Sequence, residues 1–183
     1  MTWRMARSLD VLLNEVNAAA PKRSKVSDGG IGDPAHSARV SDHNPNDAGV
    51  VRARDFTHDP AGGLDADKLA MHVASLLGKR PALGAGAYVI WRRRIISTDR
   101  LGEGWRPYPG SDPHDKHVHV SVGTGRYDST EPWGWPPAKP LGRFPARFKE
   151  ARKELRKQRD DKTAPAALRQ RARAALQALR GEK

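Results

Sequence analysis

Two segments of the chain carry apolar residues at helical spacing. The first predicts an amphipathic helix that ends before Pro21, with apolar positions Leu9, Leu12, Leu13, Val16 and Ala20. The second predicts a helix that closes at Gly78, with apolar positions Leu69, Val73, Leu76 and Leu77. Between them lie about forty residues rich in Gly, Asp, Asn, Pro and Ser, and so long a loop is usually functional or pinned, for example by a metal ion.

Alternation of apolar and polar residues predicts strands further along the chain. Residues 87–91 and 92–97 predict two short strands joined by a tight basic turn. In residues 116–122 the valines fall on one face, and the other face carries His117, His119 and Ser121. The sequence therefore predicts an α+β fold, with flanking helices and a long loop, in which a small antiparallel sheet carries these histidines.

A change of composition separates this domain from the rest of the chain. Four prolines and a glycine lie within residues 131–140, so we predict a Pro/Trp-rich linker over residues 131–143. The linker joins a domain at residues 1–130 to a basic tail at residues 144–183. Helical spacing predicts two helices in the tail, with apolar positions Phe144, Phe148, Ala151 and Leu155 in one and Leu168, Ala172, Leu176 and Leu179 in the other.

Charge is distributed unevenly along the chain, whose net charge is +12. Residues 139–183 contain 15 basic and five acidic residues, whereas residues 1–138 contain 18 basic and 16 acidic residues. We interpret the tail either as a helical hairpin that lies on the domain or a solvated charged tail, or as an electrostatic tether for a polyanion. Because the domain itself is nearly neutral, anionic wall polymers or a membrane surface are preferred to nucleic acid as the partner. We expect a monomer.

The composition also limits the chemistry and the compartment. No cysteine is present, so disulfides, thiolate nucleophiles and cysteine zinc sites are excluded, and any metal must bind His, Asp or Glu. The first residues mix charges into the apolar positions and show no small-residue cleavage site. We therefore expect a chain made soluble in the cytoplasm, without a signal peptide or a membrane span.

The histidines at positions 117 and 119 project from the same side of the last predicted strand. Two imidazoles on one rigid face can begin a zinc site, but further ligands must come from elsewhere. The long loop offers His43 and, after a strand-like run at residues 50–54, Asp55. Both residues, together with one imidazole from the later strand, make a three-ligand set with an open position for water, as in catalytic zinc sites.

These residues resemble the motifs of the M15-type zinc peptidases. The family includes D-alanyl-D-alanine carboxypeptidases and phage peptidoglycan endolysins, and is related in fold to lysostaphin-like enzymes and the hedgehog signalling domain. Its first motif, S-x-H followed by A-x-D, is matched by SDH at 41–43 and ARD at 53–55, with a gap several residues longer than the commonest pattern. Its second motif is matched in the H-x-H form at 117–119. The resemblance covers roughly residues 1–127.

The resemblance implies a role for each matched residue. It implies Zn²⁺ as the cofactor, with His43, Asp55 and His119 as the ligands. His117 takes the general acid/base position that Glu or Asp holds in other members, and Asp115 either orients His117 or itself acts as the base. Arg39, which precedes the first motif, is implied as the cation that steadies the substrate carbonyl or carboxylate.

The resemblance implies hydrolysis of an amide bond in the stem peptides of bacterial peptidoglycan. A compact chain without cysteine or signal peptide is typical of an endolysin that reaches the cell wall after release. Two other functions remain open at this point. One is an HNH-like nuclease, motivated by the Asp42-His43 pair, the nearby asparagines and the basic tail. The other is a non-enzymatic, metal-stabilised module that binds cell walls or belongs to a virion.

The other histidines and the aromatic residues each keep two interpretations. His58 is a turn cap or an additional ligand, and His72 is a packed or surface residue of a helix. His36 and His114 either line the cleft or lie on exposed loops. Substrate subsites and core packing are both open for Trp91, Trp105 and Tyr108.

Overall fold

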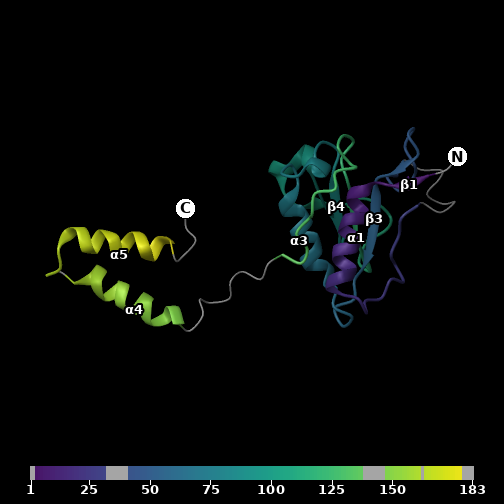
Figure 1. Ribbon diagram of the computed structural model, residues 1–183. Helices are drawn as coiled ribbons and strands as arrows, with labels where there is room; N and C mark the ends of the chain where they lie inside the picture. Colours follow the sequence, from purple (N-terminus) through teal and green to yellow (C-terminus); the bar gives the residue numbers. More distant parts are fainter. Residues whose placement is uncertain (1–2, 32–40, 138–146, 162, 179–183) are drawn as a thin grey trace. The chain divides into compact units, whose positions relative to one another are not determined.

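The computed structural model describes residues 3–31, 41–137, 147–161 and 163–178. The chain forms two compact units, Met1–Ala138 and Lys139–Lys183 (Figure 1). Within the described residues, no helix combines the length and the apolar character that crossing a membrane requires.

A five-stranded antiparallel sheet forms the centre of the first unit. Its strand order is β3 (Ala53–Thr57), β7 (His117–Ser121), β4 (Tyr88–Trp91), β5 (Arg94–Ser97) and β6 (Arg106–Pro107). Two further short strands pair in parallel, and they are β1 (Arg4–Met5) and β2 (Val50–Val51). The order places β7 inside the sheet, with β3 on one side and β4 on the other.

Helices α1 (Arg7–Ala19) and α3 (Ala66–Leu76) cover one face of this sheet (Figure 1). The strands contribute fully buried side chains to that face, among them Phe56, Val118 and Val120. The helices meet them with the apolar positions that the sequence predicts, as Leu9, Leu12, Val16, Leu69 and Val73. The opposite face is left for polar side chains. The predicted α+β class, with its antiparallel sheet, flanking helices and C-terminal helices, is confirmed.

The hairpin of β4 and β5 closes with the basic turn that the sequence predicts. Arg92 and Arg93 have φ angles of 45° and 57°. Two consecutive left-handed residues form the kind of turn whose twist matches that of the flanking strands. The turn also holds the loop before β7, because its N–H groups donate to the carbonyls of His114 at 3.0 Å and Pro113 at 2.8 Å.

The segment between α1 and α3 contains a buried ion pair that is hydrogen-bonded to the sheet. The fully buried guanidinium of Arg23 lies 2.6 Å from the Asp28 carboxylate. Asp28 Oδ1 also accepts hydrogen bonds from the backbone N–H and the hydroxyl of Thr57, at 2.9 and 2.8 Å. Burial raises the pKa of Asp28, but the hydrogen bonds from Arg23 and Thr57 hold it below its ordinary value. The described part of the long loop is therefore pinned to the end of β3.

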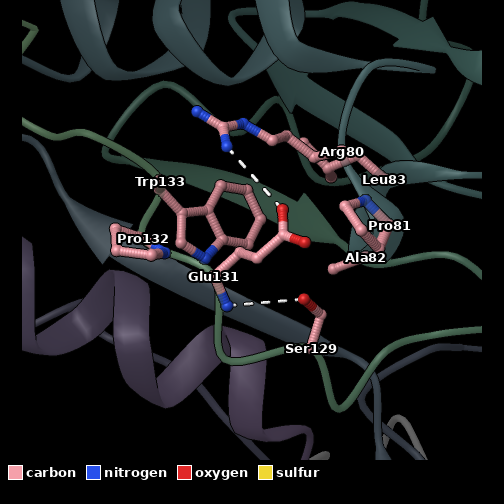
Figure 2. Close-up of a pocket in the computed structure, with 8 residues that line it drawn as sticks. All are labelled: Arg80, Pro81, Ala82, Leu83, Ser129, Glu131, Pro132 and Trp133. Carbon is pink, nitrogen blue, oxygen red and sulfur yellow. Dashed lines mark hydrogen bonds and ion pairs between the residues drawn. The ribbon is translucent and has the colours of Figure 1, made fainter.

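Residues 131–135 belong to the first unit and pack into it, although the prediction starts the linker at residue 131. Trp133 is 4% exposed and belongs to the core. Its indole N–H donates to Ser8 O at 2.8 Å, and its backbone N–H donates to Glu15 Oε1 at 2.9 Å. Figure 2 shows the indole near the short 3₁₀ helix η1 (Pro81–Leu83), next to the ion pair of Arg80 with Glu131. Prolines indicate irregular backbone, but they do not tell whether that backbone is buried.

The second unit contains α4 (Arg147–Asp160) and α5 (Ala166–Ala178), which pack against each other. Both helices of the tail are therefore confirmed, while Phe144 and Leu179 lie outside the described residues. Ala172 is buried. The described basic side chains that are exposed on these helices are Lys153, Arg156, Lys157, Arg171 and Arg173.

Replacing Trp133 tests whether this segment is part of the domain. We expect Trp133→Ala to lower the free energy of unfolding by about 3–5 kcal/mol, because a buried indole is lost. Urea denaturation followed by circular dichroism measures the change. Trp3→Ala serves as the control, because Trp3 is 45% exposed, and we expect it to cost about 0.5 kcal/mol or less. Equally small losses for both variants would contradict the packing described here.

Candidate metal centre

The pairing of β3 with β7 brings two of the predicted ligands together. Asp55 lies directly opposite His119 in the register of the two strands, and Thr57 lies opposite His117. Residues paired in this way project from the same face, with Cβ atoms about 5 Å apart. Phe56 and Val118, one position along, point to the helices. Asp55 and His119 therefore meet on the opposite, polar face of the sheet.

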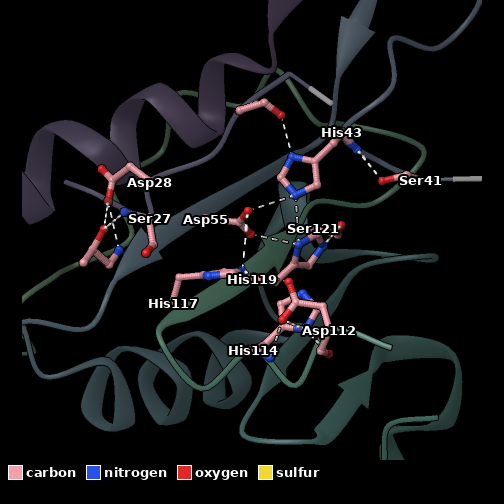
Figure 3. Close-up of polar contacts among 12 residues, drawn as sticks. Ser27, Asp28, Ser41, His43, Asp55, Asp112, His114, His117, His119 and Ser121 are labelled. Carbon is pink, nitrogen blue, oxygen red and sulfur yellow. Dashed lines mark hydrogen bonds and ion pairs between the residues drawn. The ribbon is translucent and has the colours of Figure 1, made fainter. Parts of the chain in front are cut away.

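His43 reaches the same point from a loop. Its backbone N–H donates to Ser41 Oγ at 3.2 Å, and its Nδ1 lies 2.5 Å from the carbonyl oxygen of Gly30. A carbonyl oxygen only accepts hydrogen bonds, so Nδ1 carries the hydrogen and Nε2 keeps its lone pair. That Nε2 faces Asp55 and His119 (Figure 3).

The two imidazole nitrogens and the two oxygens of the Asp55 carboxylate have the spacing of a coordination polyhedron. His43 Nε2 lies 3.1 Å from His119 Nδ1 and 3.3 Å from Asp55 Oδ2, and His119 Nδ1 lies 3.0 Å from Asp55 Oδ1. Ligands held at about 2.0–2.2 Å in a tetrahedron are about 3.3 Å apart. The group is also buried, with His43 7% and His119 4% exposed. His43, Asp55 and His119 thus form a buried group that could hold a metal ion.

The electrostatics of the group favour an ionised carboxylate. Burial raises the pKa of Asp55, but its hydrogen bonds with His119 and His43 and their charges hold the pKa well below its ordinary value. Burial lowers the pKa of His43. The Asp55 carboxylate and the Gly30 carbonyl raise this pKa by more than burial lowers it, so the net shift is upward. A proton on His43 competes with a cation, so metal binding at this site weakens as the pH falls.

A second layer of residues fixes the orientation of His119. Its Nε2 lies 3.0 Å from Ser121 Oγ, which leaves Nδ1 for the metal position. Tyr88 stacks on the imidazole, with ring centroids 5.3 Å apart and planes inclined by 16°. Burial and the charge of Asp42 raise the pKa of Tyr88, whose hydroxyl is hydrogen-bonded to Ser121 and Asp42. Asp42 in turn pairs with Arg52. Such partners set the tautomer and the direction of a ligating histidine.

Gly29 forms part of the wall around Asp55. The Asp55 backbone N–H donates to Gly29 O at 2.8 Å. A Cβ atom added to Gly29 would lie 2.5 Å from Asp55 Oδ2, far inside van der Waals contact. The sequence analysis missed this residue, and the only signal for it is the Gly29-Gly30 dipeptide in the long loop.

His117 stands beside the three-ligand group without joining it. Its Nε2 lies 3.8 Å from Asp55 Oδ2 and 3.8 Å from Asp112 Oδ2. Asp115, the predicted partner of His117, is exposed and makes no hydrogen bond or ion pair with it in the described structure. The carboxylate next to His117 is therefore that of Asp112, which the sequence analysis did not select. Spacing along a loop does not determine which of two nearby acidic residues lies next to His117.

His114 is buried next to His117. The two ring centroids are 5.0 Å apart, and the centroid of His119 is 5.5 Å from that of His114. His114 Nδ1 lies 2.9 Å from Asp112 O. Burial lowers the pKa of His114, and the charge of His119 acts in the same direction, so this imidazole is neutral at neutral pH.

A cleft of about 270 Å³ opens over the three-ligand group and over the neighbouring histidines, His114 and His117. Six histidine and aspartate side chains line it, and they are His43, Asp55, Asp112, His114, His117 and His119. The other lining residues are Ser41, Tyr88, Ile90, Tyr108 and Ser111. The described residues that line it include no arginine or lysine. Arg39 and His36 lie outside the described residues, so the role predicted for Arg39 stays a prediction.

The remaining candidates have structural roles in the described part of the chain. His58 Nδ1 accepts a hydrogen bond from Ala66 N at 3.1 Å, at the start of α3, which agrees with a capping role. His72 Nε2 lies 3.0 Å from Trp133 O. Trp91 is buried in the core, and the partly buried Trp105 packs against the core.

Known proteins add no assignment to this description. A comparison with known protein families, with curated proteins and with solved structures finds no match for the chain. The function is therefore inferred from the chemistry of the metal centre and from the motifs at residues 41–55 and 117–119.

Removing one imidazole tests the ligand set. We expect His43→Ala and His119→Ala each to lower the affinity of the tightest metal-binding step by more than about 100-fold, beyond the usual effect of residues that only orient a ligand. Titration of the metal-free protein with Zn²⁺ in a calorimeter measures this affinity. His72→Ala is the matched control and should bind as the wild type does. Unchanged affinity in both ligand variants would refute the assignment.

Adding a methyl group at Gly29 tests the wall around Asp55. We expect Gly29→Ala to lower the affinity for Zn²⁺ by about 10–100-fold, because the Asp55 carboxylate must move away from its present position. Gly102→Ala is the control, since a Cβ atom there would meet nothing within 4 Å. If the Gly29 and Gly102 variants bind Zn²⁺ equally well in the same titration, Gly29 does not determine the position of Asp55.

Proposed function

We propose that this protein is a zinc-dependent peptidoglycan peptidase that hydrolyses an amide bond in cell-wall stem peptides. The observation that carries the proposal is the convergence of His43 Nε2, Asp55 and His119 Nδ1 at 3.0–3.3 Å from one another, on the floor of an open cleft. Three protein ligands with room for further ones are the pattern of a catalytic zinc site. The peptidoglycan substrate is supported by the resemblance of the two motifs to those of M15-type peptidases.

Zinc held by these ligands supplies Lewis-acid chemistry, which activates water for attack and polarises the scissile carbonyl. The chain itself keeps the ligands in their reactive forms. The backbone carbonyl of Gly30 fixes the tautomer of His43, and Ser121 holds the far nitrogen of His119. The Asp55 carboxylate is ionised because its pKa is held low.

His117 is the residue we assign to proton transfer. Its Nε2 is 3.8 Å from the Asp55 carboxylate, close beside the three-ligand group, and its side chain is 16% exposed to the cleft. In this role Nε2 accepts the proton of the attacking water and later returns it to the departing amine nitrogen. Asp112 Oδ2, also 3.8 Å from this Nε2, stabilises the imidazolium between the two steps.

The geometry offers less to the two alternative functions. An HNH-like nuclease places its histidine on a hairpin that is followed by a short helix with the last ligand, whereas the ligands here lie on a loop and on two paired strands. A purely structural metal site would be closed by a fourth protein ligand, whereas this group faces a cleft of about 270 Å³.

We assign the helical tail to binding of the cell wall or a membrane surface. Its described helices expose basic side chains on α4 and α5. A cationic surface attracts anionic wall polymers and anionic lipid headgroups alike, and the attraction is screened by salt. Such a tether keeps the peptidase domain near an insoluble substrate.

Incubation of the full chain with purified murein tests the activity. We expect new amine groups in the presence of Zn²⁺ and none after treatment with a chelator, and mass spectrometry of the released fragments identifies the bond. His117→Ala should lower the rate by about 10²–10⁴-fold while the tight Zn²⁺ step is kept, because a general acid/base contributes that much. No new amine groups at any Zn²⁺ concentration would refute the enzyme assignment. Plasmid cleavage instead would favour the nuclease.

A further inference from the structure

We infer that Asp112, His114 and His117 form a second, weaker metal site, which inhibits the enzyme when zinc is in excess. The three residues each offer one ligand atom, and these atoms all lie within 4.8 Å of one another. Two imidazoles and one carboxylate are the same set of donors as in the first centre, and they suit zinc and neighbouring divalent metals. The site lies at the same cleft, because His117 is two residues before His119 on β7.

The loop that carries this second site is held in place. His114 is 7% exposed, and its ring lies edge-on to Tyr108 at 5.3 Å and to His117 at 5.0 Å. Its carbonyl accepts the N–H of Arg92 at 3.0 Å, which fastens the loop to the turn between β4 and β5. The Asp112 carbonyl oxygen, 2.9 Å from His114 Nδ1, also fixes the orientation of the ring.

The second site should fill only after the first. Asp112 is 53% exposed at its side chain, whereas Asp55 is 14% exposed. His117 Nε2 and Asp112 Oδ2 are 3.8 Å apart, compared with 3.0–3.3 Å between the ligand atoms of the first group, so they must draw together to bind an ion. His117 Nε2 lies only 3.8 Å from Asp55 Oδ2, so two cations bound at both sites repel each other.

Occupation of the second site would remove the proton acceptor. The lone pair of an imidazole nitrogen either takes a proton or binds a metal ion, and it cannot do both. A metal ion on His117 would therefore prevent the proton transfer assigned to it. This consequence rests on the proposed function, whereas the site itself does not.

Metal stoichiometry tests the site. The full chain is stripped of metal and titrated with Co²⁺, whose visible absorption reports coordination, and with Zn²⁺ in a calorimeter. We expect a tight equivalent followed by a weaker one, with affinities at least about 100-fold apart. Asp112→Asn and His114→Gln should each lose the weaker equivalent and keep the tight one, which also shows that the variants are folded. Asp115→Asn, in the same loop, should bind both.

Three outcomes would overturn the site. They are a single equivalent in the wild type, a weaker equivalent that persists in both the Asp112 and the His114 variant, and loss of that equivalent in Asp115→Asn as well. The last would show that any acidic side chain of the loop attracts the second ion, without a defined set of ligands.

The inhibition has its own measurement. We expect the release of amine groups from murein to rise with the first equivalent of Zn²⁺ and to fall with the second. In Asp112→Asn the fall should need at least about 10-fold more Zn²⁺, judged by the ratio of rates at excess and at optimal zinc within each variant. A wild type that binds the second equivalent without slowing would refute the inhibition alone. If murein is not cleaved at all, the proposed function fails, while the stoichiometry still decides on the site.

Discussion

The register of β3 against β7 is the constraint on which the rest of this site depends. It sets Asp55 opposite His119 and Thr57 opposite His117. A shift of one residue would turn the histidines toward α1 and α3 and would move the valines of β7 out of the core. The burial of Val118, Val120 and Phe56 therefore fixes the position of the ligands. The candidate metal centre is, in this sense, the polar face of the same alternation that builds the hydrophobic core.

The parts of the structure with a strong local pattern could be predicted from the sequence. The valines and histidines of β7 alternate regularly, and the spacing of the apolar residues in α1 and α3 leaves little choice of helix face. The group of three residues that could hold a metal ion could also be predicted, because His43, Asp55 and His119 lie in two short motifs. Strands β1 and β6 have two residues each, which is too short for any periodicity to appear.

Other features depend on contacts between segments far apart in the sequence. Gly29 matters only because Asp55 folds against it, and Ser121 matters only because the imidazole two residues earlier turns toward it. The choice of Asp112 over Asp115 follows from how the loop before β7 is fastened to the Arg92–Arg93 turn. Trp133 is buried because α1 offers it Glu15 and the Ser8 carbonyl, which a proline-rich composition does not reveal.

The interior position of β7 has a consequence for the lifetime of the site. Any motion that frees His119 must break the hydrogen bonds of β7 to β3, to β4, or to both. Openings of that kind belong to the slowest class of native fluctuations, with free energies near that of global unfolding. The amide protons of residues 117–121 should therefore be among the last in the chain to exchange with solvent. A ligand set on such a strand is already ordered when the ion arrives, so binding loses little conformational entropy.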